Sequence, residues 1–269
     1  MSAPRKTTKL TQPRNGECDL FPTTLSTAAS TSAAIRYRRS LSARILGASM
    51  AIVIASRFRG PDSSGNGGYS AGVIAKELGG DEVEVTLRLP PPLDEVLRLD
   101  DEGRVWDDHA LIAEAHPGAV GLTPPDPVSW GDAAAAEVPD LDSPFPHCFV
   151  CGAARSEGDG LRIFAGPVAG RDVYAATWIV SEDTVGPEFV WATLDCPGAY
   201  ATGALGRGAI VLGRLTARVD RVPQAGERCV VVGWHLDSEG RKHGAGTALF
   251  TEGGELLGLA KALWLEPRR

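Results

Sequence analysis

One stretch of the sequence occurs twice: LDDEGR at residues 99–104 and LDSEGR at residues 236–241. One short match carries little weight by itself, because Asp, Glu and Gly are common in hairpin turns. The segments around the two copies also match, however, and they match in the same order. Internal repetition of this kind indicates a duplicated structural unit. We therefore predict two copies of one fold in a single chain.

Each copy of the turn lies between predicted antiparallel strands. The first strand of each copy alternates apolar and polar residues, which is typical of a strand with one buried face. A proline-containing turn separates it from the second strand, which leads into the repeated turn, and a short apolar strand follows. The strands are predicted at residues 83–89, 95–99 and 110–115 in the first copy and at residues 215–220, 229–236 and 256–262 in the second.

A single helix precedes the strands in each copy. Residues 67–78 follow Asn66, a favoured N-cap residue, and the glycine pair at 79–80 stops this helix. Residues 187–195 begin with Pro187, which suits the first turn of a helix because its missing N–H is not needed there. Each copy is therefore predicted to be an α+β unit in which an antiparallel sheet wraps around one central helix.

Two strands of the second copy are apolar on both faces, at residues 229–234 and 256–259. A strand with one wet face would alternate, so these patterns predict that the two copies pack against each other or that the chain forms a homodimer. The chain then divides into four segments. They are a disordered extension or a start assigned too far upstream at residues 1–49, a degenerate N-terminal half at 50–115, a linker at 116–145 and a C-terminal half at 146–269.

Composition and charge limit the function. The 269 residues carry a formal net charge of −7, which argues against a nucleic-acid partner, since phosphate binding needs a basic surface. The longest apolar runs are too short to cross a bilayer, so no membrane association is expected. A cytoplasmic location is expected as well, because the apolar run that follows the arginine-rich residues 36–44 lies too deep in the chain for a secretory signal.

Three motifs resemble the hotdog-fold superfamily of acyl-CoA thioesterases. CFVCG at residues 148–152, followed by GLRI at 160–163, resembles the opening segment of thioesterases of the phenylacetate-pathway type. FVWATLD at 189–195 resembles their central helix, which carries a catalytic carboxylate, and NGG at 66–68 resembles a helix-start motif that usually reads HGG. The resemblance covers residues 50–269 and is stronger in the second half. It implies a tandem (double) hotdog fold.

Alignment of the two halves, taken with this resemblance, implies one composite site. Ala75 falls opposite Asp195, so only the second half retains the acid, whereas only the first half retains the glycine pair at the helix start. Hotdog sites lie between the helix start of one unit and the helix acid of the other. The resemblance therefore implies that Asn66, Gly67 and Gly68 form the catalytic site with Asp195, and that the second equivalent site is inactive.

The residues of this site suit thioester hydrolysis. Amide N–H groups at a helix start polarise a thioester carbonyl, and glycine lets the carbonyl approach the backbone closely. Asp195 would act as a general base on water or attack directly. Simpler structural roles stay open: Asn66 as a helix cap only, and Asp195 as a partner of local amides at the break in its helix. If the site forms, Asp195 lies within about 8 Å of the glycine amides.

The basic tip of the second turn and the cysteine pair have less specific patterns. Arg241 and Lys242 are candidates for binding the phosphates of CoA, although a solvated turn has the same pattern. Cys148 and Cys151 form a CxxC pair, but no second pair or HxxxH motif completes a four-ligand zinc site. We therefore expect a structural turn here, no metal, and no cofactor apart from the CoA of the substrate.

The leading hypothesis is an acyl-CoA thioesterase that acts on medium or aromatic acyl groups. Two alternatives stay open. A hydratase or dehydratase on the same fold would generally need an Asp–His pair, and no histidine lies near Asp195 in the sequence. A non-catalytic acyl-thioester-binding protein is the alternative from a different class, because one of the two sites has already lost its acid.

Overall fold

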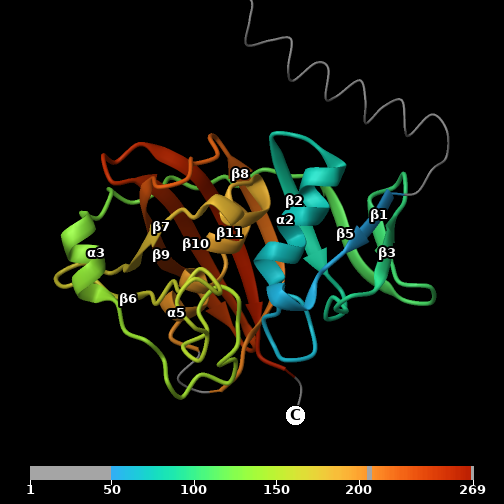
Figure 1. The fold of residues 1–269 in the computed structure, drawn as a ribbon, viewed down its shortest axis with the longest axis horizontal. Helices are drawn as coiled ribbons and strands as arrows, with labels where there is room; N and C mark the ends of the chain where they lie inside the picture. Colours follow the sequence, from blue (N-terminus) through green and yellow to red (C-terminus); the bar gives the residue numbers. More distant parts are fainter. Residues whose placement is uncertain (1–49, 205–207, 268–269) are drawn as a thin grey trace, which may run out of the picture.

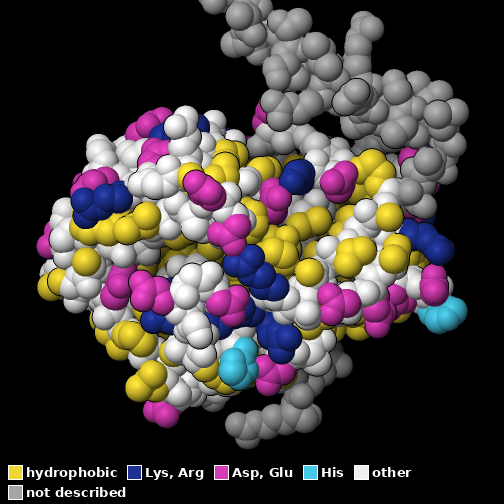
Figure 2. All heavy atoms as spheres, in the orientation of Figure 1, with side chains coloured by type: hydrophobic (Ala, Val, Ile, Leu, Met, Phe, Trp, Pro, Cys, Tyr) yellow, Lys and Arg dark blue, Asp and Glu magenta, His cyan; other side chains and the backbone are white. Residues whose placement is uncertain are grey.

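The computed structural model describes residues 50–204 and 208–267, and Figure 1 shows their arrangement. The expected extension at residues 1–49 lies outside the described residues. Within the described ranges, no helix combines the length and the apolar character needed to cross a membrane. Figure 2 shows acidic and basic side chains interspersed over one face of the molecule, with apolar side chains between them.

The described residues form two series of strands and helices, separated by a short helix. The first series comprises β1 (Met50–Val53), the 3-10 helix η1 (Ser56–Phe58), α2 (Gly67–Leu78), β2 (Glu82–Leu87), β3 (Val96–Leu99), β4 (Arg104–Trp106) and β5 (Leu111–Pro117). The separating helix is α3 (Trp130–Ala136). The second series comprises β6 (Gly166–Pro167), β7 (Tyr174–Ile179), the 3-10 helix η2 (Glu182–Thr184), α4 (Pro187–Thr193), α5 (Cys196–Ala201), β8 (Val211–Val219), β9 (Arg228–Glu239), β10 (Lys242–Thr251) and β11 (Leu256–Leu265).

All strands join one antiparallel sheet whose order is β1-β3-β4-β5-β2-β8-β11-β10-β9-β7-β6. Apart from the two-residue β6 at the edge, this order is a mirror image about the β2–β8 pair. Counted outward from that pair, the strands of the first half follow the order β2, β5, β4, β3, β1, and those of the second half follow the order β8, β11, β10, β9, β7. Each series is the second, fifth, fourth, third and first strand of its half, with β6 left out. The two halves meet edge to edge, with Val85 opposite Leu215 in the shared register. The duplication predicted from the repeated turn is therefore present in the topology.

The repeated turn forms the equivalent hairpin in both halves. It joins β3 to β4 in the first half and β9 to β10 in the second. Gly103 and Gly240 hold the same position in the two copies, with φ angles of 79° and 58°. Left-handed backbone of this kind favours glycine, because a Cβ atom would clash with the neighbouring carbonyl. The two turn sequences are alike because this backbone conformation favours glycine at the same position in both, and the likeness therefore indicated equivalent hairpins.

The helices begin where the sequence predicts. Helix α2 spans Gly67–Leu78, and the Asn66 side chain caps it by accepting a hydrogen bond from the Tyr69 amide at 2.8 Å. The second predicted helix, at residues 187–195, ends two residues early and is followed by α5. Asp195 lies between α4 and α5 with φ −85° and ψ −83°. The break in the helix thus places this carboxylate at a bend.

Both faces of the second half's sheet are buried, as its apolar strands predict. On β9, Cys229 and Val231 belong to the main core with α2, α4 and α5, whereas Val230 and Val232 belong to a second core. Helix α3 covers this outer face and contributes Ala133 and Ala136 to the second core. The covering element therefore comes from the predicted linker at residues 116–145. The apolar outer face does not require a second copy of the chain, and the homodimer stays a prediction.

Strand β10 was not predicted from the sequence. Its small residues give no alternation, and Gly244 and Gly246 interrupt the pattern. Gly246 is needed for packing, because a Cβ atom there would lie 2.2 Å from the Trp234 ring on the neighbouring strand. A glycine that close packing requires therefore interrupts the apolar/polar alternation by which a strand is predicted.

Candidate active site

Two glycines bring the helices of the two halves into close contact. A Cβ atom at Gly68 would lie 2.4 Å from the Cβ of Asp195, and one at Gly72 would lie 2.6 Å from the Cβ of Trp191. Both distances are far below a normal carbon–carbon contact, so only glycine allows α2 and α4 to approach this closely. The start of α2 therefore lies directly against the break between α4 and α5.

Asp195 lies at this contact, and its carboxylate is held by the first half. Its Oδ2 atom accepts hydrogen bonds from the Gly68 amide at 3.0 Å and from Asn66 Nδ2 at 2.8 Å. The expected approach within about 8 Å is thus present as direct contact. Only 2% of the Asp195 surface is exposed. The Oδ1 atom has no hydrogen-bond partner among the described residues.

The burial of Asp195 changes its acidity. Loss of hydration raises the pKa of this carboxyl group from 3.8 to about 7. The hydrogen bond from the Gly68 amide opposes this rise, because it stabilises the charged form. The nearby sulfur of Cys148 adds to the rise, and the Asn66 amide opposes it.

Asn66 performs two roles at once. Its Oδ1 atom caps α2 through the Tyr69 amide, while its Nδ2 group donates to Asp195. The cap that we considered as a simpler explanation is therefore real, but it leaves the other end of the side chain aimed at the carboxylate. Among the described residues no acceptor binds the Gly67 amide, whereas the Gly68 amide is occupied by Asp195. Gly67 thus offers the available donor at this helix start.

A cavity of about 220 Å³ opens beside these residues, at the junction of the two halves. Asn66, Gly67 and Asp195 contribute its polar wall. The rest of the wall is largely apolar and comes from both halves. It includes Pro61, Leu87, Pro91, Phe145, Ile210, Leu212, Trp264 and Leu265. An apolar cavity with a few convergent polar groups is the usual form of a small-molecule site.

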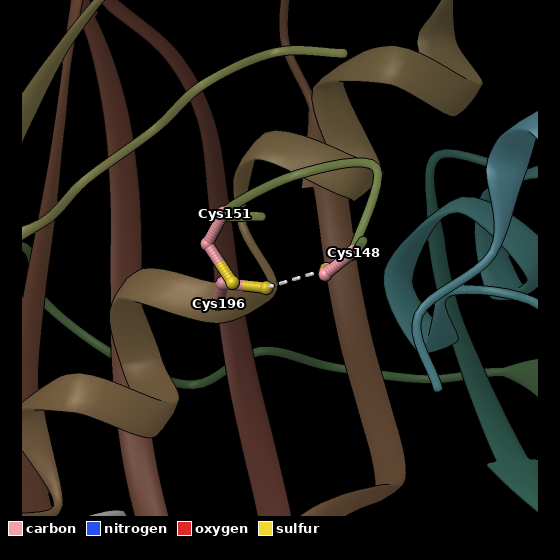
Figure 3. Close-up of side chains that lie close together, drawn as sticks. All are labelled: Cys148, Cys151 and Cys196. Carbon is pink, nitrogen blue, oxygen red and sulfur yellow. Dashed lines mark hydrogen bonds between the residues drawn. The ribbon is translucent and has the colours of Figure 1, made fainter. Parts of the chain in front are cut away.

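Three cysteines line the same cavity, and Figure 3 shows them side by side. Cys148 and Cys151 lie on the loop before β6, and Cys196 begins α5. All three are buried free thiols, and the Sγ atoms of Cys148 and Cys196 are 3.8 Å apart. A hydrogen bond from Cys151 holds the pKa of the Cys148 thiol well below its usual value, and the same interaction raises the pKa of Cys151. The CxxC pair was predicted as a turn. Cys196 was not predicted to join it, because nothing in the chain spacing links Cys196 to that pair.

The basic tip lies at the end of the strands that border the cavity. Arg241 and Lys242 are exposed, and Arg241 Nη1 donates to the Glu266 carbonyl at 2.7 Å. Lys242 pairs with Leu265, which lines the cavity. The structure therefore places Lys242 opposite a cavity-lining residue, while neither Arg241 nor Lys242 lines the cavity itself.

The corresponding helix start in the other half carries different residues. Pro187 supplies no amide N–H at the start of α4, and Ala75, which the alignment of the two halves pairs with Asp195, lies on α2. Glu188, in the first turn of α4, forms an ion pair with Lys76 of α2 at 2.8 Å. The inactivity of the second equivalent site stays a prediction.

The sequence matches no family model and no curated protein. Solved structures resemble the fold. A candidate thioesterase II from Thermobifida fusca superposes with a TM-score of 0.55 at 12% identity, covering 86% of this chain and 98% of its own. A candidate thioesterase from Novosphingobium aromaticivorans gives 0.53 at 15% identity, covering 82% and 96%.

The TesB protein of Mycobacterium avium subspecies paratuberculosis is also similar, with a TM-score of 0.51 at 13% identity over 77% of this chain and 89% of its own. At such low identity the likeness concerns the fold. The chain thus has the hotdog fold that its motifs resemble, with a large antiparallel sheet and few helices.

Proposed function

We propose that this chain is an acyl-CoA thioesterase with a single composite site between two hotdog halves. One observation carries the proposal: Asp195 of the second half binds the Gly68 amide at the helix start of the first half, beside an apolar cavity. Neither half has both parts. The similarity of the fold to thioesterases supports the same class of reaction.

The geometry suits attack of water on a thioester. The carbonyl oxygen binds at the Gly67 amide, where the helix dipole stabilises the negative charge that develops. Asp195 Oδ1 accepts a proton from water while the water oxygen bonds to the carbonyl carbon. The carbon–sulfur bond then breaks, Asp195 returns the proton to the departing sulfur, and CoA leaves as the thiol. Acid and thiol are the products, and Asp195 is regenerated.

The surroundings of the cavity suggest how the substrate lies. The apolar wall receives a medium or aromatic acyl group, because burial of apolar surface favours such a ligand. Arg241 and Lys242, at the end of the strands that border the cavity, bind the phosphates of CoA. CoA enters as part of the substrate and no separate cofactor takes part.

Of the two alternatives, the binding protein is the stronger. None of the described histidines lines the cavity, so the Asp–His pair of a hydratase has no candidate there. A binding protein would use the same cavity and the same helix start. It differs only in that no thiol is released.

The test is release of thiol from a panel of acyl-CoAs by the wild type and by Asp195→Asn. We expect turnover to fall at least about 100-fold in the variant, since loss of a general base typically costs that much. Asp172→Asn, at an exposed position, is the matched control and should retain full activity. Unchanged turnover in Asp195→Asn would contradict the role of Asp195. Saturable acyl-CoA binding with no turnover of any thioester would favour the binding protein.

A further inference from the structure

Three buried thiols form a cluster that thioester hydrolysis does not use. Within the described part of the chain, the Sγ atoms of Cys148, Cys151 and Cys196 all lie within 4.8 Å of one another. Two come from one loop and the third from the start of α5 (Figure 3). Packing alone does not require sulfur at three adjoining positions. The grouping of three cysteine thiols, which are soft metal ligands, therefore calls for an explanation other than packing.

The spacing of the sulfurs fits a bound metal ion. A tetrahedral zinc site has Zn–S distances of about 2.3 Å, which places neighbouring sulfurs about 3.8 Å apart. The Sγ atoms of Cys148 and Cys196 lie at 3.8 Å. A disulfide needs about 2.0 Å, so its formation would require these atoms to move together by nearly half of their separation. The arrangement as it stands therefore suits an ion between the sulfurs better than a covalent bond.

The backbone around the CxxC pair is held in a tight turn. The Gly152 amide donates to the Cys148 carbonyl at 2.8 Å, and the Cys148 amide donates to the Phe145 carbonyl at 3.0 Å. A Cβ atom at Gly152 would lie 2.5 Å from the Cys148 carbonyl oxygen, so the turn requires glycine at that position. The loop thus fixes both thiols before any ion binds, which lowers the entropic cost of binding.

A donor from the other half faces the cluster. Asn66 Nδ2 lies 3.7 Å from Cys148 Sγ and 4.0 Å from Cys196 Sγ, in addition to its contact with Asp195. Amide donors that point at sulfur stabilise thiolates, which are the form that binds metal. The surroundings of the three sulfurs therefore resemble the outer shell of a metal site.

We infer that Cys148, Cys151 and Cys196 bind one zinc ion as three thiolates, with the fourth coordination position open toward the cavity. All three cysteines line that cavity, so a solvent molecule or a ligand in the cavity can reach the ion. Three protein ligands with an open fourth position differ from the closed four-ligand sites of purely structural zinc. Binding releases the protons of the thiols. This inference does not depend on thioester hydrolysis.

The test is metal titration of the full chain after treatment with chelator and reductant under anaerobic conditions. With Co²⁺ as the probe, we expect one ion per chain, sulfur-to-cobalt charge-transfer absorption and the visible bands of a tetrahedral site. Zn²⁺ should then displace the cobalt. Folding of each sample is checked by circular dichroism, so that loss of binding is not mistaken for loss of structure.

Cys196→Ser and Cys151→Ser should weaken binding by more than about 100-fold, because loss of a ligand costs at least as much as loss of its supporting contacts. Cys229→Ser is the matched control, since Cys229 is equally buried but lies on β9 outside the cluster. It should bind like the wild type. Wild-type protein without charge-transfer absorption would overturn the inference, whatever the variants do. Equal binding by Cys196→Ser would overturn it as well.

Discussion

Asn66 contacts both sides of the candidate site. One end of its side chain caps α2 and the other end donates to Asp195, so a single residue couples helix stability to the position of the carboxylate. The cap could be predicted from the residue type alone. The second contact depends on an acid 129 positions further along the chain.

Two substitutions at Asn66 separate its roles. Serine retains a cap acceptor but is too short to reach Asp195, whereas alanine loses both contacts. We expect Asn66→Ala to lower the free energy of unfolding by about 1 kcal/mol more than Asn66→Ser. Both should lower turnover by about 10- to 100-fold, because each removes a hydrogen bond to a charged group. Chemical denaturation and thiol release give the two quantities. Wild-type turnover in Asn66→Ser would mean that the residue only caps the helix.

Among the secondary-structure elements, Glu82 on β2 forms hydrogen bonds to the segment after β5 and to β8. Its carboxylate on β2 accepts from the Val120 amide at 2.7 Å and from Arg218 Nη1 on β8 at 3.1 Å. It thereby connects the first half to the linker and to the second half. The Val120 amide, and then the Arg218 guanidinium, hold the pKa of Glu82 below its usual value.

The lowered pKa predicts how stability depends on pH. A carboxyl group with a lower pKa in the folded state stabilises the protein above its unfolded pKa of about 4.3, and this contribution is lost as the pH falls through the folded value. We expect Glu82→Gln to lower the free energy of unfolding by about 0.5–1 kcal/mol at neutral pH. The difference should be smaller at an acidic pH below the folded pKa of Glu82 than at neutral pH.

Urea denaturation at the two pH values measures this effect. Glu157→Gln, at an exposed position, is the control and should change stability at neither pH. A Glu82→Gln difference that persists unchanged in acid would mean that the side chain acts by packing and not by its charge.

At the scale of the whole molecule, α3 decides whether the outer face of the sheet is covered. Ala133 on this helix is fully buried against the second core, while Ala134 beside it is exposed. We expect Ala133→Asp to detach α3, because a carboxylate placed there loses its hydration without a partner. The free energy of unfolding should fall by more than about 2 kcal/mol, and the exposed strands should bind an apolar dye and self-associate.

Dye fluorescence and sedimentation at several concentrations measure these changes. Ala134→Asp adds the same charge to the same helix and should behave like the wild type. If Ala133→Asp neither exposes apolar surface nor associates, the expected detachment of α3 is wrong and the packing of this helix tolerates the added charge.

The duplication, the helix starts and three strands of each half could be predicted from the sequence. The turn at residues 99–104 and 236–241 and the cap at Asn66 depend on local backbone chemistry, which a few neighbouring residues dictate. Comparison of the halves also showed that Ala75 and Asp195 differ, which indicated one asymmetric site. Such features are readable because their causes lie within a short stretch of chain.

Contacts between distant segments could not be predicted from the sequence and became known from the structure. Cys196 lies beside a cysteine 48 positions away in the sequence. Part of the predicted linker covers the outer face of the sheet. The absence of a side chain at Gly68 allows Asp195 to contact the start of α2. None of these contacts leaves a periodic or spaced signal, because packing distances between helices and sheet are set by side-chain volume after the chain has folded. The candidate chemistry was therefore named from motifs, but its geometry came from packing.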